Sequence, residues 1–249
     1  QTCIRSSIRE AIEQMTTVQG QLRKMLETVA HALGPDLRER FVFVGGCTTA
    51  LFITDTITLE DVRATDDVDL IIDLAGYGDW VQLQDQLREK GFSESHEDNV
   101  ICRMRLGELK VDFMPDDESI LGFSNRWYAR GIETAVTYPL TEALEIKQLL
   151  PELFVATKLE AFLGRGNDDL LMSRDVEDIL LIVDGREDLV NEVKGATDDI
   201  RTFIAEQFRT LQHHYDFEGF VHGNIRGPEG RVDIVQNRFA AIAASDGNT

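Results

Sequence analysis

Three aspartates beside apolar runs are the residues whose types and spacing could do chemistry. Asp67 and Asp69 stand in "TDDVDLII", and Asp112 stands in "KVDFM". Residues two apart on a strand share a face, so Asp67 and Asp69 would lie side by side while Val68 points into the core. Carboxylates beside an apolar strand repel one another and lose solvation, and a bound divalent cation would offset both costs.

The three carboxylates would converge if the strand that carries Asp112 pairs with the strand that begins at Asp67. Three acids can hold two Mg²⁺ ions about 3.5–4 Å apart, an arrangement that serves in-line phosphoryl and nucleotidyl transfer. The pattern also fits a solvated strand end, or an acidic pocket of the calcium-binding or response-regulator kind. We interpret Asp66 as a solvated or capping neighbour whose side chain points away from the other two.

A glycine pair precedes these acids. Gly45 and Gly46 follow the apolar run "FVFV" and precede "CTTALFI". Glycines at the start of a helix let backbone N–H groups come close to phosphates. Taken alone, a glycine pair is most often only a turn.

In this order, the motifs resemble the nucleotidyltransferase superfamily related to DNA polymerase β. The shared pattern is an apolar strand with Gly-Gly or Gly-Ser, then Thr-x-Asp-hydrophobic-Asp, then a distant strand aspartate. The resemblance implies transfer of a nucleoside monophosphate from an NTP to a hydroxyl, with two Mg²⁺ ions held by Asp67, Asp69 and Asp112. The positions that it places at the nucleotide phosphates are Gly45, Gly46, Thr48 and Thr65.

A later segment resembles one particular group within this superfamily. "LFVATKLEAFLGRGNDDLLMSRDVEDILLIV" is similar to abortive-infection toxins of the AbiEii type, from type IV toxin–antitoxin systems. In those proteins one helix bears a lysine, and a later helix begins with a basic residue and Asp-x-x-Asp. The implied roles are neutralisation of the triphosphate by Lys158, phosphate binding by Arg174, and orientation of Lys158 or the acceptor by Asp175 or Asp178. The resemblance covers roughly residues 40–185.

Two positions depart from the family pattern. Gly46 stands where many relatives have Ser, so a phosphate-binding hydroxyl would be absent or come from Thr48 or Thr49. Arg174 stands where Lys is common, which keeps the charge and changes its geometry. From the residues alone, Lys158 also fits an amine that extends to solvent. Arg174, Asp175 and Asp178 also fit ordinary charge placement at a helix N-terminus.

The elements that must position these residues follow from periodicity. A helix is predicted from Ser6 to Leu33, ended by Gly34-Pro35, and a second in "GDWVQLQDQLREKGF". Strands are predicted at "FVFVGG", at "DVDLIIDL", and as a hairpin in "NVICRMRLGELKVDFMPD". This order predicts an α/β (α+β) fold, with a small mixed sheet and packed helices as the nucleotidyltransferase core of residues 1–150.

The remaining segments are predicted to be mainly helical. "CTTALFI" would open a helix, and "TDTITLEDVRAT" reads as an irregular loop. A strong helix from about Pro151 opens a mostly helical C-terminal domain over residues 151–249. In it, Ser173 and Thr197 are good N-caps, and a short helix is expected near Ile234 to Ile242.

The composition of the chain disfavours some classes of binding partner. The 249 residues carry a net charge of −20, which disfavours nonspecific binding to nucleic acid or an anionic membrane. A tRNA acceptor would need a local basic face. No apolar run reaches the length of a membrane span, and three scattered cysteines predict reduced thiols in a cytoplasmic protein. The candidates for the basic face are Lys147, Lys158, Arg165 and Arg174.

The acceptor and the cellular role stay open. The resemblance implies an RNA (tRNA) end or a protein as acceptor, and an antitoxin protein as partner if the chain is a toxin. A small-molecule acceptor, as in aminoglycoside-type resistance transferases, is an alternative. A nucleotide-binding or interaction module that has lost turnover is another. No residue identifies the nucleotide base.

Overall fold

The computed structural model describes residues 17–165 and 169–247, and the chain divides into two units. The first, here called the sheet unit, contains the described residues up to Ala50 together with Val62–Ser124 and Tyr128–Leu149. The second, here called the helical unit, contains Leu51–Asp61, Asn125–Trp127 and the described residues from Leu150 onward. Each unit is described by itself.

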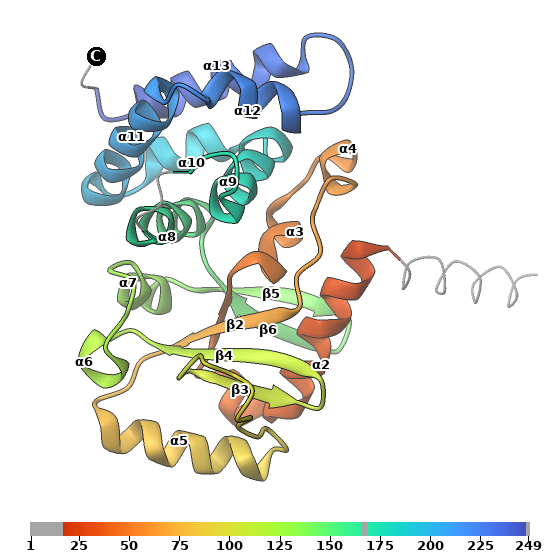
Figure 1. Ribbon diagram of the computed structural model, residues 1–249, viewed down its shortest axis with the longest axis vertical. Helices are drawn as coiled ribbons and strands as arrows, with labels where there is room; N and C mark the ends of the chain where they lie inside the picture. The colour runs from red at the N-terminus through yellow and green to blue at the C-terminus, as the bar shows by residue number, and fades with distance from the viewer. Residues whose placement is uncertain (1–16, 166–168, 248–249) are drawn as a thin grey trace, which may run out of the picture. The chain divides into compact units, whose positions relative to one another are not determined.

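Six strands form one mixed sheet in the sheet unit, in the order β3-β4-β2-β1-β6-β5 (Figure 1). The pairs β2–β4 and β1–β6 are parallel, and the other three pairs are antiparallel. The predicted mixed sheet with helices is therefore confirmed. The strands are β1 (Val42–Val44), β2 (Asp67–Ile72), β3 (Arg103–Leu106), β4 (Leu109–Pro115), β5 (Val136–Thr141) and β6 (Leu144–Gln148).

An aromatic cluster fills the face of the sheet that lies opposite the aspartates. Phe113 of β4 is fully buried, and its ring centroid lies 5.3 Å from that of Phe41 and 5.4 Å from that of Phe92. Phe41 follows helix α2 (Val18–Arg38), and Phe92 follows helix α5 (Tyr77–Glu89). Alternation along β4 therefore gives Phe113 to the core and leaves Asp112 on the other face.

Helix α2 extends past its predicted end. Gly34 has φ 72° and breaks the helix there, but the chain then makes another helical turn to Arg38. Pro35 is compatible with that turn because the first residues of a helix need no N–H donor. The Thr17 hydroxyl caps the start of α2 by accepting from Gly20 N at 3.1 Å. The predicted part of this helix before Thr17 lies outside the described residues.

Two short segments differ from prediction. The helix predicted in "CTTALFI" is present as α3 (Thr49–Phe52), but it is only four residues long and follows a 3₁₀ turn, η1 (Gly46–Thr48). The predicted loop contains helix α4 (Thr56–Leu59). The signal for α4 is Asp55, whose carboxylate accepts from the N–H groups of Ile57 and Thr58 at 2.9 Å each and caps the helix.

The predicted hairpin is confirmed as β3 and β4. Gly107 in its turn has φ +62°, a conformation that glycine adopts without a Cβ penalty. After β4 the sheet unit adds two short helices before β5 and β6. They are α6 (Glu118–Leu121) and α7 (Tyr128–Glu133).

The chain after Leu150 is mostly helical, as predicted (Figure 1). Ser173 caps α9 by accepting from Val176 N at 3.3 Å. The hydroxyl of Thr197, in contrast, bonds Asp199 Oδ1 at 2.5 Å and makes no side-chain cap. The helices are α8 (Pro151–Gly164), α9 (Arg174–Gly185), α10 (Leu189–Gly195), α11 (Asp198–His213), α12 (Phe217–Asn224) and α13 (Arg231–Ala243).

Burial explains why these helices pack together. Helix α8 is apolar on nearly all sides and buries a continuous run, Leu153–Leu159. Helix α11 presents Phe208, whose ring lies 4.8 Å from that of Phe239 on α13. Helix α13 includes the predicted Ile234 to Ile242 segment. Among the described residues, no helix is both long and apolar enough to cross a membrane.

Candidate metal centre

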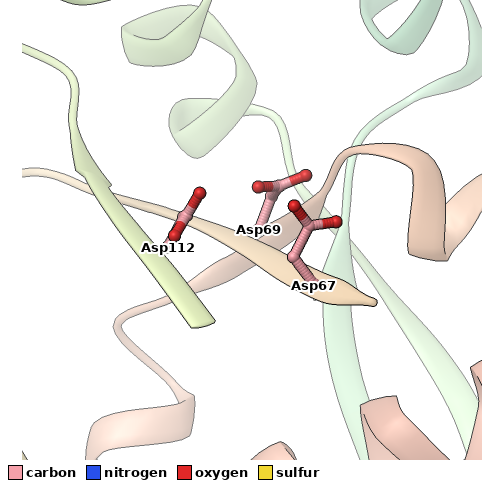
Figure 2. Close-up of side chains that lie close together, drawn as sticks. All are labelled: Asp67, Asp69 and Asp112. Atoms are coloured by element: carbon pink, nitrogen blue, oxygen red, sulfur yellow. The ribbon is translucent and has the colours of Figure 1, made fainter. Parts of the chain in front are cut away.

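The three aspartates meet on one face of the sheet. In the parallel pair of β2 and β4, Asp69 lies opposite Asp112, and Asp67 shares its face with Asp69. Figure 2 shows the three side chains grouped across the two strands, and one oxygen of each lies within 4.8 Å of the others. All three donors are carboxylate oxygens, which suit a hard cation such as Mg²⁺.

The glycine turn lies directly against this group. Val44 of β1 pairs with Asp69, so the next residue, Gly45, follows at the edge of the site. A Cβ on Gly45 would stand 1.8 Å from Asp69 Oδ2, and its φ of +74° also favours glycine. Gly46 then begins the 3₁₀ turn. Close approach and backbone conformation therefore both require glycine at position 45.

The threonines near the site have different partners. Thr65 donates its hydroxyl proton to Asp67 Oδ1 at 2.5 Å and so orients one member of the triad. Thr48 is fully buried, and its hydroxyl donates to the carbonyl of Gly45 at 2.9 Å. Thr49 is also fully buried. The structure thus places the Thr65 hydroxyl at the triad and uses the Thr48 hydroxyl within the turn.

Arg103 is the residue at this centre that the motif analysis missed. Its Nε donates to Asp112 Oδ1 at 2.7 Å, and its Nη2 donates to Asp112 Oδ2 at 2.8 Å and to Asp67 Oδ2 at 3.3 Å. Its side chain is 15% exposed. The hydrogen bonds to Asp112, with its charge and that of Asp67, raise the pKa of Arg103 above its ordinary value. The signal was present in the hairpin, because the turn at 107–108 sets Arg103 opposite Asp112.

The immediate surroundings are buried and negatively charged. Burial, followed by the charges of Asp112 and Asp69, raises the pKa of the Cys102 thiol to about 12. Burial and the charges of Asp69 and Asp67 raise the pKa of Cys47 as well. The negative charge of the three aspartates therefore affects both thiols.

Asp66 stands apart from the triad. Its side chain is 73% exposed, and it accepts from Lys110 Nζ at 2.6 Å. That pairing lowers the pKa of Asp66. The interpretation of Asp66 as a solvated neighbour is confirmed.

A second polar group lies in the helical unit. Lys158 of α8 donates from Nζ to Asp178 Oδ2 at 2.6 Å and to Asp175 Oδ1 at 3.3 Å, both on α9. Arg165, at the end of α8, also pairs with Asp175. Because only 9% of the Lys158 side chain is exposed, its amine does not extend to solvent. The alternative interpretation of Lys158 as an amine that extends to solvent is therefore wrong.

The predicted site residues therefore fall into two groups. The sheet unit brings together Gly45, Gly46, Thr65, Asp67, Asp69 and Asp112. The helical unit brings together Lys158, Asp175 and Asp178. Arg174 begins α9 and is exposed.

Comparison with known proteins adds no further assignment. A scan against protein-family models found no match, and a search of curated proteins found no similar sequence. Interpretation of the centre therefore rests on its own geometry and on the motifs that the sequence carries.

Proposed function

We propose that this protein is a Mg²⁺-dependent nucleotidyltransferase, which moves a nucleoside monophosphate from an NTP to a hydroxyl group. The observation that carries the proposal is the convergence of Asp67, Asp69 and Asp112 on adjacent parallel strands, with Gly45 against Asp69. Such a set of carboxylates suits a pair of hard cations that clamp a phosphoryl group. The resemblance to the nucleotidyltransferase superfamily supports the same conclusion.

The charge balance of the centre also supports cation binding. Arg103 supplies one positive charge to a group of three carboxylates. The remaining negative charge, close to buried apolar strands, favours a divalent cation. The donors are all oxygens, so Mg²⁺ or Mn²⁺ fits this set better than a metal that prefers sulfur or imidazole.

In the proposed reaction, the acceptor oxygen forms a bond to the α-phosphorus of the NTP. The bond from that phosphorus to the oxygen bridging to the β-phosphate breaks, and pyrophosphate leaves with the electron pair. The hydroxyl proton passes to Asp112 or to water. Bound Mg²⁺ would supply neutralisation of charge on the phosphates and on the attacking oxygen. Gly45 and Gly46, without side chains, leave the backbone open to phosphate oxygens.

For Lys158 we propose a role in neutralising the triphosphate. This role rests on the resemblance to AbiEii-type proteins. Its contacts with Asp175 and Asp178 support the orienting function that the resemblance gives to those two acids. These buried ion pairs hold the amine in one place within the helical unit.

The acceptor class and the toxin role rest on the resemblance alone. An RNA end or a protein hydroxyl is the acceptor that it favours, with an antitoxin as partner. The net charge of −20 disfavours an extended RNA-binding face. A small-molecule acceptor is therefore the main alternative, and the assay below separates the classes.

The test is incubation with each of the four α-³²P-labelled NTPs, Mg²⁺, and one acceptor pool at a time: total tRNA, cell protein, or small metabolites. Asp69→Asn is the inactive variant. The exposed Asp66→Asn is the matched control, because it removes a neighbouring carboxylate outside the triad. We expect label on one pool with wild type and with Asp66→Asn, and none with Asp69→Asn.

The negative outcomes are also informative. Equal labelling by Asp69→Asn would contradict the role of the triad. If no pool is labelled, calorimetry with each NTP and Mg²⁺ follows. Binding that Asp69→Asn abolishes would favour a nucleotide-binding module, whereas an absence of binding would reject the transferase.

A further inference from the structure

One guanidinium bridges two of the three triad carboxylates. Arg103 Nη2 donates to both Asp67 Oδ2 and Asp112 Oδ2, while Nε takes the other oxygen of Asp112. The arrangement is a bidentate, charge-assisted pair, which is stronger and more geometrically specific than a single hydrogen bond. Only 12% of the Asp112 side chain is exposed, so water competes little for these contacts.

Arg103 Nη2 lies where a metal ion shared by two carboxylates would lie. A metal ion shared by Asp67 and Asp112 would have to lie between their carboxylates, and Arg103 Nη2 already contacts both. Both Asp112 oxygens are also engaged by Arg103. An ion that takes Asp112 as a ligand must therefore share or replace these contacts.

We propose that Arg103 competes with divalent cations for the carboxylate of Asp112, so that metal binding displaces its guanidinium. The inference rests on the proposed function, because it takes the triad as the metal centre. Arg103 is a positioning residue in this scheme. Without a metal, it keeps two repelling carboxylates together, and with a metal it leaves at least one oxygen of Asp112.

The alternative, in which Arg103 stays bound to Asp112 while the metal binds, predicts a different effect on metal affinity. A carboxylate has about four lone-pair sites, so Arg103 could instead remain in place and orient Asp112 for the metal. Partners that orient a ligand in this way raise metal affinity, and their loss typically lowers it by about 10–100-fold. Competition predicts instead that loss of Arg103 raises the metal affinity. The contact of Nη2 with a second ligand, Asp67, favours competition, because orientation of Asp112 requires no such bridge.

The experiment is calorimetric titration of Mn²⁺ into the metal-free full chain. The variant is Arg103→Gln, and the matched control is Arg105→Gln. Arg105 lies on the same strand and pairs with Asp98 at 2.7 Å. We expect Arg103→Gln to bind Mn²⁺ about tenfold more tightly than wild type, which corresponds to losing one competing charge-assisted contact. Arg105→Gln should bind like wild type.

Thermal unfolding supplies a second readout. Metal-free Arg103→Gln should melt at a lower temperature than wild type, because the triad has lost its counter-ion, and Mn²⁺ should remove the difference. If this variant does not fold, Arg103→Lys keeps the charge but not the two-pronged pair. Arg103→Lys should also bind Mn²⁺ more tightly than wild type does.

The outcomes separate this inference from the proposed function. Unchanged or weaker Mn²⁺ binding by Arg103→Gln, with binding by wild type intact, would overturn competition and leave the transferase standing. An absence of Mn²⁺ binding by wild type and by every variant would overturn both. Mn²⁺ binding by Arg103→Gln but not by wild type would support competition in its strongest form.

Discussion

Asp69 on β2 and Asp112 on β4 are direct partners in a parallel strand pair, so two distant segments of the chain contribute carboxylates to one face of the sheet. Asp67, two residues before Asp69, adds a third carboxylate to that face. The in-register parallel pairing places Asp67 and Asp69, at the start of β2, beside Asp112 in the middle of β4. The centre is therefore a consequence of strand order, and its properties are open to direct tests.

The first prediction concerns metal-dependent stability. Mn²⁺ at about 100 times its Kd should add about 2.7 kcal/mol to the free energy of unfolding of wild type, because it binds only the folded chain. Asp69→Asn should lose this gain, and Asp66→Asn should keep it. Thermal unfolding with and without EDTA measures the difference. An equal gain for Asp69→Asn would place the ion elsewhere.

The second prediction compares two glycines with positive φ. Gly107→Ala meets nothing within 4 Å, so it should cost only the backbone strain of about 1–2 kcal/mol. Gly45 has φ 74° with ψ −172°, a conformation essentially restricted to glycine, and Gly45→Ala also drives a Cβ into Asp69. It should be more destabilising than Gly107→Ala and should also weaken Mn²⁺ binding. Urea unfolding and calorimetry of both variants provide the test, and equal losses would argue against close packing of Gly45 on Asp69.

A third prediction concerns the buried lysine of the helical unit. Lys158→Met removes the buried amine that pairs with Asp178 at 2.6 Å and with Asp175 at 3.3 Å, and such losses cost about 3–5 kcal/mol. Arg174→Gln changes an exposed charge and should stay within about 0.5 kcal/mol of wild type. Chemical denaturation of wild type and the two variants measures these changes in the free energy of unfolding. A Lys158→Met protein as stable as wild type would show that the ion pairs add little to stability.

The fourth prediction follows from the thiol beside the triad. Because the pKa of Cys102 is raised to about 12 from an ordinary 9.0, the reactive thiolate is scarce at pH 8. Between pH 9.0 and about 12, the Cys102 thiol is protonated in the folded chain but ionised in the unfolded chain. The difference in the pKa of Cys102 therefore lowers the free energy of unfolding as the pH rises through this range.

Alkylation measures the state of that thiol. A Cys3→Ser variant treated with iodoacetamide at pH 8 should carry no label on Cys102 or Cys47 until it is unfolded. Mass spectrometry of the digested protein identifies the labelled residue. Rapid labelling of Cys102 in the native, EDTA-treated protein would show that the thiol is neither buried nor shielded as described.

Much of the candidate centre follows from local signals in the sequence. The two-residue spacing of Asp67 and Asp69 gives their shared face, and the turn at Gly107 gives the β3–β4 hairpin. The same turn fixes the register that sets Arg103 opposite Asp112, so this contact was open to prediction by counting residues back from the turn. The contact lies outside the motifs, because Arg103 belongs to none of them.

Other features depend on contacts between distant parts of the chain. The parallel pairs β2–β4 and β1–β6 are set by crossover connections rather than by turns, and no local pattern specifies which strands meet. The burial of Lys158 likewise depends on how α9 packs on α8. The extra helical turn after Gly34 was missed because Gly-Pro is a common stop signal, yet proline is compatible with the first turn of a helix.

We propose that the triad holds the cations of a nucleotidyl transfer. The most direct measurement is anomalous X-ray scattering at the manganese edge, from crystals grown with Mn²⁺ and an NTP analogue that cannot be cleaved between its α- and β-phosphates. We expect two peaks about 3.5–4 Å apart, bounded by Asp67, Asp69 and Asp112 and in contact with the phosphates. A bound analogue with no manganese at these carboxylates would contradict it.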